Sequence, residues 1–247
     1  KQLIRFKSTA GIVFDPEAIR LRADDAIATL AAELEQSGVR FEFGIQVEEL
    51  LVDGDESSRI VGVLTDHGVR NTSQVVIAAG AWSRPLLGTA GIELTANPVV
   101  VARYTTRPLA GISKEMPMLM FSDSVHRFWI REEKGGLLIG AADPRPLPPD
   151  RCVEAEDPPH ADDLPGDHAV RVREYVRGIE HILPALAGAD IDEVRAGLPC
   201  YSDNRLFVCT TVVGLAGLYV MAACNEAGIT HGPGLGRHMC ELIVDGD

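Results

Sequence analysis

The first clear hydrophobic pattern in the chain lies within residues 15–38. Apolar side chains recur there every three or four residues, at Ala23, Ile27, Leu30, Ala31 and Leu34. Asp15-Pro16 offers a capping residue followed by proline at a first helical position. Ser37-Gly38 offers a glycine suited to the left-handed end of a helix. The pattern predicts a helix that begins at Asp15-Pro16 and ends at Ser37-Gly38.

Strand-like patterns follow this helix. Alternating or continuous apolar runs predict strands over residues 39–43, 45–52, 60–64 and 75–79, with a hairpin turn at Asp66-His67-Gly68. The run at residues 75–79 is continuous, as in a strand that is covered on both faces. A short helix is predicted over residues 81–87.

The middle of the chain has the pattern of an antiparallel sheet. Strands are predicted over residues 98–107, 118–121, 128–131 and 136–140. A loop rich in proline and aspartate follows at residues 143–168, then an amphipathic helix at 169–183. Further strands are predicted at 191–196, 206–209 and 218–222, and a last helix at 233–244. The order indicates one α/β unit that an antiparallel sheet interrupts and that resumes near residue 205.

Composition excludes several classes of function. The 247 residues suffice for one large domain or two interleaved ones. The net charge of −13 argues against nucleic acid as a partner, which basic patches would bind. Apolar stretches fall short of the roughly 20 residues of a membrane span. The five cysteines form no CxxC pair, which indicates reduced thiols and a cytoplasmic protein. We interpret His160, Asp162 and Asp163 as a solvated loop and expect no metal site.

Two glycine-containing segments could approach a ligand. VVIAAGAWS (residues 75–83) places three small residues at the end of a predicted buried strand, where ligands of α/β sheets bind. CNEAGITHGPGLGR (residues 224–237) places Gly232-Pro233 at the predicted start of the last helix, whose N–H groups carry partial positive charge. Tight packing of a helix on a sheet explains either segment equally well.

A third segment, TAGIVFDPEAIRLRADDAIATLAAELEQSGVRF (residues 9–41), completes a family resemblance together with these two. In this order they resemble the D-amino-acid oxidase/glycine oxidase/sarcosine oxidase superfamily of FAD-dependent oxidoreductases. The resemblance implies a Rossmann-like FAD-binding α/β domain interleaved with an antiparallel-sheet substrate domain. It assigns residues 15–92 and 205–247 to the first domain, 93–204 to the second, and 1–14 to the edge of the substrate domain. The family's GxGxxG after an early strand is missing, so we expect that the first βαβ unit is lacking.

The resemblance also implies which residues contact FAD and what the flavin does. Positions that match the adenine, pyrophosphate and flavin-ring contacts of the family are Val47, Ala79, Gly80, Trp82, Gly228, Ile229 and Thr230. The positive end of the last helix would stabilise negative charge on the reduced flavin. The implied reaction oxidises the C–N bond of an amino acid or of a secondary or tertiary amine by hydride transfer to the flavin, so no catalytic side chain is expected. His231 would lie near the flavin.

Substrate-binding residues are less directly implied. The arginine that family members place after a GL pair is replaced here by Pro199 and Cys200. Because strand residues alternate, Arg127, Trp129 and Arg131 are predicted to share one face and are candidates, as is Tyr201. A covalent bond between FAD and Cys200 is not favoured, since the register is shifted. Cys209 stands where the family commonly has glycine.

Two alternatives stay open at the level of sequence. The chain could be a non-catalytic isolated or degenerate domain, or one that needs a partner chain to complete the FAD site. A sheet edge left open by the missing unit would favour association, including homo-oligomers. The identity of the amine substrate and the choice between oxidase and dehydrogenase are also open.

Overall fold

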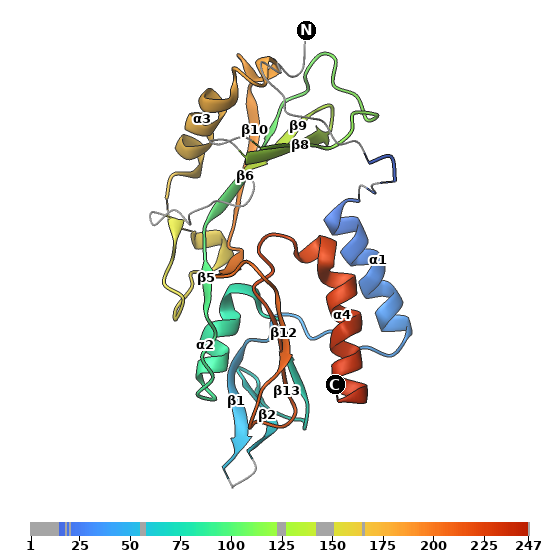
Figure 1. Cartoon of the computed structure of the whole chain (residues 1–247), viewed down its shortest axis with the longest axis vertical. Coiled ribbons are helices and arrows are strands. Elements are labelled where there is room, and N and C mark those ends of the chain that lie inside the picture. Colours follow the sequence, from blue (N-terminus) through green and yellow to red (C-terminus); the bar gives the residue numbers. More distant parts are fainter. Residues whose placement is uncertain are drawn as a thin grey trace. The chain divides into compact units, whose positions relative to one another are not determined.

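The chain folds into helices and sheets that gather into two compact units. The computed structural model describes residues 15–17, 19, 21–54, 58–122, 127–141, 151–164 and 166–246. The first unit comprises Lys1–Arg20, Val100–Arg151 and His160–Leu198. The second unit comprises Leu21–Val99, Cys152–Pro159 and Pro199–Asp247. Each unit therefore draws on segments that are far apart in the sequence (Figure 1).

The first unit is built on a five-stranded sheet in which every neighbouring pair is antiparallel. The strand order is β10-β6-β9-β8-β7. These strands are β6 (Val101–Thr106), β7 (Leu119–Ser122), β8 (Arg127–Glu133), β9 (Gly136–Ala141) and β10 (Ile191–Gly197). The antiparallel sheet predicted for the middle of the chain is confirmed.

Helix α3 (His168–Ile179) packs against one face of this sheet. The Asp167 side chain caps it by accepting a hydrogen bond of 2.9 Å from the Val170 N–H. The core between helix and sheet joins Tyr104, Phe128, Ile130, Ile139, Val172 and Ile179. The helix ends four residues before the predicted residue 183, because Pro184 opens the 3₁₀ turn η4 (Pro184–Leu186) and Leu183 lies outside the helical region.

The second unit contains three small sheets. A meander consists of β1 (Val47–Asp53), β2 (Arg59–Thr65) and β3 (Gly68–Asn71). A two-stranded sheet pairs β5 (Ala96–Pro98) with β11 (Cys200–Ser202). The third has the order β12 (Val208–Thr211), β13 (Leu218–Ala222) and β4 (Val75–Ile77), with β13 and β4 parallel. Helices combined with antiparallel and mixed sheets fit the predicted α/β class.

Helices complete the second unit. They are α1 (Ala23–Gln36), the 3₁₀ turn η1 (Gly80–Trp82), α2 (Ser83–Gly88) and α4 (Gly228–Asp245). Helix α4 packs on β12 and β13. The core gathers side chains from the three sheets and α2, including Leu50, Ile60, Ile77, Leu87, Leu218 and Val220. In the first unit, η3 (Ala161–Asp163) lies in the acidic loop before α3.

Two predictions near the start of the described chain are wrong. Helix α1 begins at Ala23 and not at Asp15-Pro16, because the Asp15 carboxylate accepts a hydrogen bond of 2.9 Å from the Glu17 N–H and closes a local turn. The helix ends as predicted, with Gly38 at φ +91°. Residues 39–43 form no strand, and Glu42 is joined to Arg70 of β3 by a side-chain ion pair of 3.3 Å instead.

The predicted start of the last helix is also wrong. Helix α4 begins at Gly228, five residues before Pro233, which lies inside it. The preceding loop sets this start, because Asn225 and Glu226 adopt left-handed φ angles of 48° and 68° and the Ala227 N–H donates to the Cys224 carbonyl at 2.8 Å. Pro233 removes one N–H from the helix ladder, which a proline does at some cost in stability.

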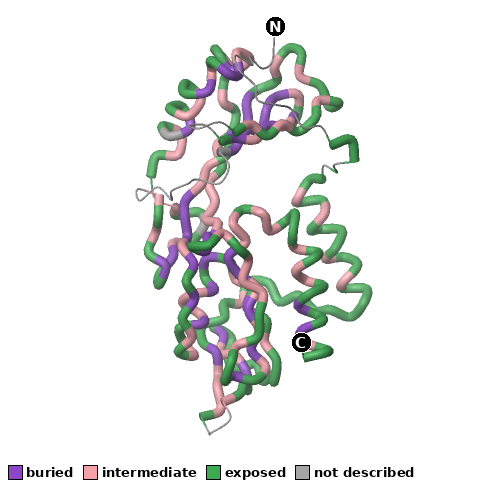
Figure 2. The backbone as a smooth tube through the Cα atoms, in the orientation of Figure 1, coloured by how far each residue is buried: buried purple, intermediate pink, exposed green. Residues whose placement is uncertain are grey.

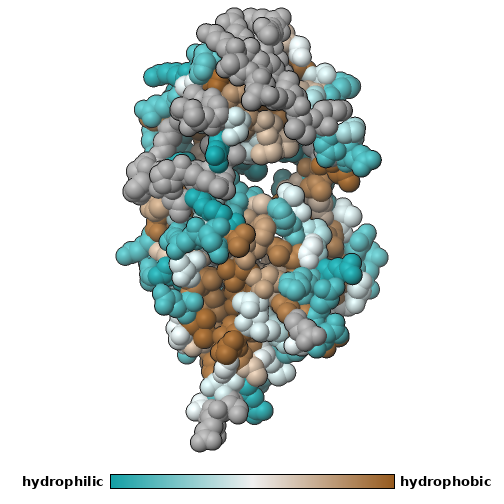
Figure 3. All heavy atoms as spheres, in the orientation of Figure 1, coloured by the Kyte–Doolittle hydropathy of each residue, from teal (hydrophilic) through white to brown (hydrophobic). Residues whose placement is uncertain are grey.

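Part of the second unit's apolar surface faces outward. Helix α1 buries none of its residues, and Ile27 and Leu30 are 55% and 56% exposed. Figure 2 shows α1 without buried positions, and Figure 3 shows hydrophobic residues gathered on the visible face of this unit. Val76 of β4 is 40% exposed, so the prediction that this strand is covered on both faces is wrong within this chain.

Candidate functional site

The carboxyl end of β4 leads directly into the turn η1. Ala79 precedes this turn, and Gly80 takes a φ of +57°, which favours glycine. No atom lies within 4 Å of the point that a Cβ on Gly80 would occupy, so a ligand can approach the backbone closely. Ser83, the first residue of α2, is fully buried, and its hydroxyl has no hydrogen-bond partner in the described parts of the chain. The strand end is therefore open at the Gly80 backbone, whereas the Ser83 hydroxyl is enclosed.

A strap over residues 152–159 holds Trp82 in place. The indole N–H of Trp82 donates to the Pro158 carbonyl at 3.2 Å. Arg84 forms an ion pair with Glu156, and the Val153 N–H donates to the Pro98 carbonyl at 3.2 Å. The sequence predicts only a loop for this segment, because no local pattern reveals a partner 76 residues away.

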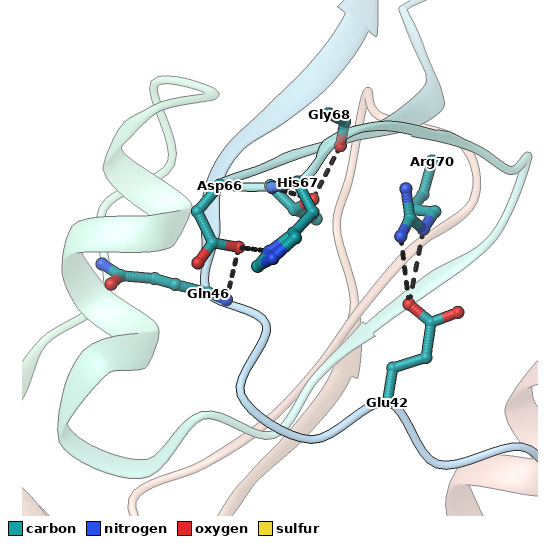
Figure 4. Close-up of polar contacts among 7 residues, drawn as sticks. Glu42, Gln46, Asp66, His67, Gly68 and Arg70 are labelled. Atoms are coloured by element: carbon teal, nitrogen blue, oxygen red, sulfur yellow. Dashed lines mark hydrogen bonds and ion pairs between the residues drawn. The ribbon is translucent and has the colours of Figure 1, made fainter.

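Val47, the expected adenine contact, is the first residue of β1 and is 39% exposed. The hairpin turn between β2 and β3 fixes the entry to this strand. Figure 4 shows the Asp66 carboxylate accepting a hydrogen bond from the Gln46 N–H at 3.0 Å and contacting the His67 ring nitrogen at 2.9 Å. The His67 hydrogen bond lowers the pKa of Asp66 below its usual value. The predicted hairpin turn is confirmed.

The residues expected at the flavin ring form the first turn of α4. Gly228, Ile229 and Thr230 precede the first helical hydrogen bond, which the His231 N–H donates to the Ala227 carbonyl at 3.0 Å. No side chain caps this end, and helix geometry leaves its first N–H groups without partners in the helix. The turn therefore presents donors and the positive end of an 18-residue helix. The His231 ring packs on Phe207 at 4.6 Å between centroids.

Cys200 and Cys209 lie close to these elements; Cys200 is buried and Cys209 is half-buried. Cys200 in β11 is 2% exposed, and burial raises the pKa of its thiol to about 11. Burial also raises the pKa of Cys209, whose sulfur lies 3.9 Å from the Leu235 carbonyl of α4. Both thiols are therefore protonated at neutral pH, which does not favour reaction as a thiolate.

The substrate candidates lie in both units. Arg127, Trp129 and Arg131 alternate along β8 with the buried Phe128 and Ile130, so all three lie on the sheet face opposite α3. Arg131 forms an ion pair of 3.3 Å with Glu133, and both side chains are mostly buried.

Tyr201 belongs to the second unit and is fully buried. It lies in β11, with the Arg205 guanidinium 4.7 Å from the centre of its ring. The structure therefore groups the other three candidates on one sheet and places Tyr201 elsewhere. Any contact between Tyr201 and a substrate would require its surroundings to move.

Trp129 occupies the space above a glycine of the neighbouring strand. A Cβ added to Gly140 of β9 would lie 2.5 Å from two indole carbons of Trp129 and 2.8 Å from its ring nitrogen. The indole therefore leans across β9 in the space that a side chain would fill. This contact could not be predicted from the sequence, because it depends on the register of two strands.

Two other kinds of site are absent from the parts of the chain that the structure describes. No group of three or more histidine, cysteine, aspartate or glutamate side chains could hold a metal ion. Nor does any described helix have the length and apolar character needed to cross a bilayer. No disulfide joins the five cysteines.

Comparison with known proteins assigns these features to a family. The chain is 30% identical over 248 residues to 4-methylaminobutanoate oxidase (formaldehyde-forming) of Paenarthrobacter nicotinovorans, covering 99% of this chain and 29% of that protein. It is 23% identical to the mitochondrial pyruvate dehydrogenase phosphatase regulatory subunit of Mus musculus, covering 99% and 27%. The fold is similar to that of L-proline dehydrogenase from P. horikoshii, with a TM-score of 0.73, 21% identity, and coverage of 91% and 56%.

The chain corresponds to only part of each of these proteins. It spans less than a third of the length of the two curated relatives and about half of the solved structure. The model described as FAD dependent oxidoreductase matches residues 2–242, almost the whole chain. The chain therefore belongs to the family of FAD-dependent oxidoreductases that includes amine and amino-acid oxidases.

Proposed function

We propose that the chain is part of an enzyme that oxidises the C–N bond of an amino acid or of a secondary or tertiary amine. The match of the family model over residues 2–242 carries this proposal. The names of relatives support the substrate class, since one is an oxidase of a methylated amino acid and a structural neighbour is a proline dehydrogenase.

The residues present fit parts of FAD. The first turn of α4 offers uncapped N–H groups, and the strand end at Ala79 and Gly80 leaves room for close approach. We propose that Gly228, Ile229 and Thr230 hold the flavin ring. Val47, Ala79, Gly80 and Trp82 would contact the rest of the cofactor. No GxGxxG follows a strand in this sequence, so the pyrophosphate cradle of the family is not among these residues.

Bound FAD would supply the electron acceptor, taking a hydride from the substrate carbon next to nitrogen. Primary and secondary amines would lose a proton from nitrogen to give an imine, and tertiary amines would give an iminium ion. Water would then hydrolyse either species to a carbonyl compound and an amine, or ammonia where the amine is primary. The part of this chain is to orient and stabilise: the positive end of α4 favours negative charge developing on a group bound there. We propose that residues 15–92 and 205–247 form the FAD-binding part of the chain. Residues 93–204 would form the substrate part, with residues 1–14 at its edge. We place the protein in the cytoplasm, in keeping with its cysteines, none of which is disulfide-bonded.

A titration with FAD tests the cofactor assignment. We expect FAD to bind and its visible absorbance to change when the first turn of α4 is intact. A variant in which Gly228 is replaced by valine should bind FAD more weakly. Equal affinity of the parent and the Gly228→Val variant for FAD would show that the first turn of α4 does not hold the flavin ring.

A second candidate function is a non-catalytic module that associates with another chain, which would complete the FAD site or use the same surface for regulation. The open apolar side of α1 supports it, as does the relative named as a regulatory subunit. Size-exclusion chromatography combined with the flavin spectrum discriminates the two. A colourless protein that does not bind added FAD but forms a stable complex or homo-oligomer would support the second candidate.

A further inference from the structure

The register of the five-stranded sheet aligns one row of residues across all of its strands. Arg195 of β10 is opposite Arg103 of β6, and Arg103 is opposite Gly140 of β9. Gly140 is opposite Trp129 of β8, which is opposite Met120 of β7. Directly opposed residues of antiparallel strands project from the same face. This row therefore lies on the face away from the α3 core.

Gly140 brings the two halves of this row together. Its missing side chain lets the Trp129 indole lie over β9, the strand that separates Trp129 from Arg103 in the sheet. The indole nitrogen lies 2.8 Å from the point that a Cβ on Gly140 would occupy. An indole N–H can only donate a hydrogen bond. The row thus sets an indole N–H over β9, which is hydrogen-bonded to the strand that carries Arg103.

The two arginines in the row have like charges on directly opposed positions. Such pairs destabilise a sheet unless an anion neutralises them. Glu193 partly neutralises Arg195, with an ion pair of 2.6 Å. Arg103 is exposed and forms no ion pair or hydrogen bond with any residue that the structure describes. The row therefore has an excess of positive charge at Arg103, in a chain whose net charge is −13.

The surroundings of Arg103 suit a carboxylate with an apolar stem. A guanidinium fork matches the two oxygens of a carboxylate. Trp129 and Met120 continue the row as apolar surface, and the buried Leu138 lies in the next row on the same face. Arg131 on this face is already paired with Glu133.

We propose that Arg103 and Arg195, with Trp129 as the adjoining wall, bind the carboxylate of an organic acid that has a short apolar stem. This proposal rests on the proposed function and narrows its substrate class to amines that carry a carboxylate. It gives that carboxylate a partner other than position 199 or 200, where the sequence has no arginine.

Tryptophan fluorescence tests binding without FAD or turnover. The chain has two tryptophans, so Trp82→Phe leaves Trp129 as the sole reporter. We would titrate this protein with butanoate at constant ionic strength, and separately with neutral butanamide and with sulfate. Butanoate should change the fluorescence saturably. The proposal would be overturned if butanoate caused no change in fluorescence. It would also be overturned if butanamide or sulfate caused the same change as butanoate.

Charge-removing variants localise the site. Arg103→Gln should weaken butanoate binding by at least about tenfold, and Arg195→Gln should weaken it less, because Glu193 already competes for that side chain. Arg177→Gln, which removes an exposed arginine from α3 on the opposite face, is the matched control and should leave binding unchanged. Equal affinity in Arg103→Gln, with its circular dichroism unaltered, would contradict the assignment. Because no cofactor is needed, failure here leaves the FAD-dependent activity to be tested separately.

Discussion

Replacing Gly140 with alanine tests the position of the Trp129 indole. The new Cβ would lie 2.5 Å from two ring carbons, whereas ordinary contacts begin at 3.4 Å, so the indole must move by about 1 Å. Overpacking of this kind costs about 1–3 kcal/mol. Alanine is also better than glycine inside a strand by about 0.5–1 kcal/mol, which offsets part of that cost. We expect a net loss of about 1–2 kcal/mol in the free energy of unfolding.

A double-mutant cycle separates the clash from any general effect. Unfolding in urea, followed by circular dichroism, gives the stability of the parent, Gly140→Ala, Trp129→Ala and the double variant. Alanine at position 140 should destabilise the parent but be neutral or stabilising when Trp129 is absent. At this chain length each kcal/mol lowers Tm by about 2–4 °C. An equal cost of Gly140→Ala in both backgrounds would refute the placement of the indole over β9, and with it the row that joins Trp129 to Arg103.

Further predictions concern the second unit. Asp66→Asn should destabilise the β2–β3 hairpin at neutral pH, and because the pKa of Asp66 is lowered on folding, the difference from the parent should vanish as the pH falls through that pKa, as acid titration of stability would show. Cys200 should react with an aromatic disulfide reagent far more slowly than the exposed Cys152 and Cys240, and labelling followed by mass spectrometry would reveal the reverse. Its raised pKa also means that its contribution to stability is complete below pH 9 and is lost as the pH rises toward 11. Gly228→Val should weaken FAD binding by about tenfold or 1.4 kcal/mol, and unchanged flavin content would remove the role of that turn.

Local patterns were enough to predict most elements of the fold. Period-two alternation predicts that Arg127, Trp129 and Arg131 share one face of a strand, and in the structure all three lie on the face of β8 opposite α3. The antiparallel character of that sheet followed from its short strands and turn residues. The order of its strands did not, because the neighbours β10 and β6 are separated by about ninety residues of chain.

The errors share a physical cause. Asp15-Pro16 has the sequence of a helix start but closes a side-chain turn, and Pro233 resembles a first helical residue but lies inside a helix whose start is set by left-handed residues upstream. Local propensity is a weak guide where a loop conformation decides. Arg103 was missed for a related reason, since its relation to Arg195 and Trp129 exists only in the register of the sheet.

The most direct test of the central claim is anaerobic reduction of bound flavin. The FAD-loaded protein would be mixed, without oxygen, with a secondary amine that carries a carboxylate and with the matching hydrocarbon acid that lacks nitrogen. We predict that the amine bleaches the flavin absorbance and yields a carbonyl product, and that the nitrogen-free acid does neither. Bound FAD that no amine or amino acid reduces would contradict it.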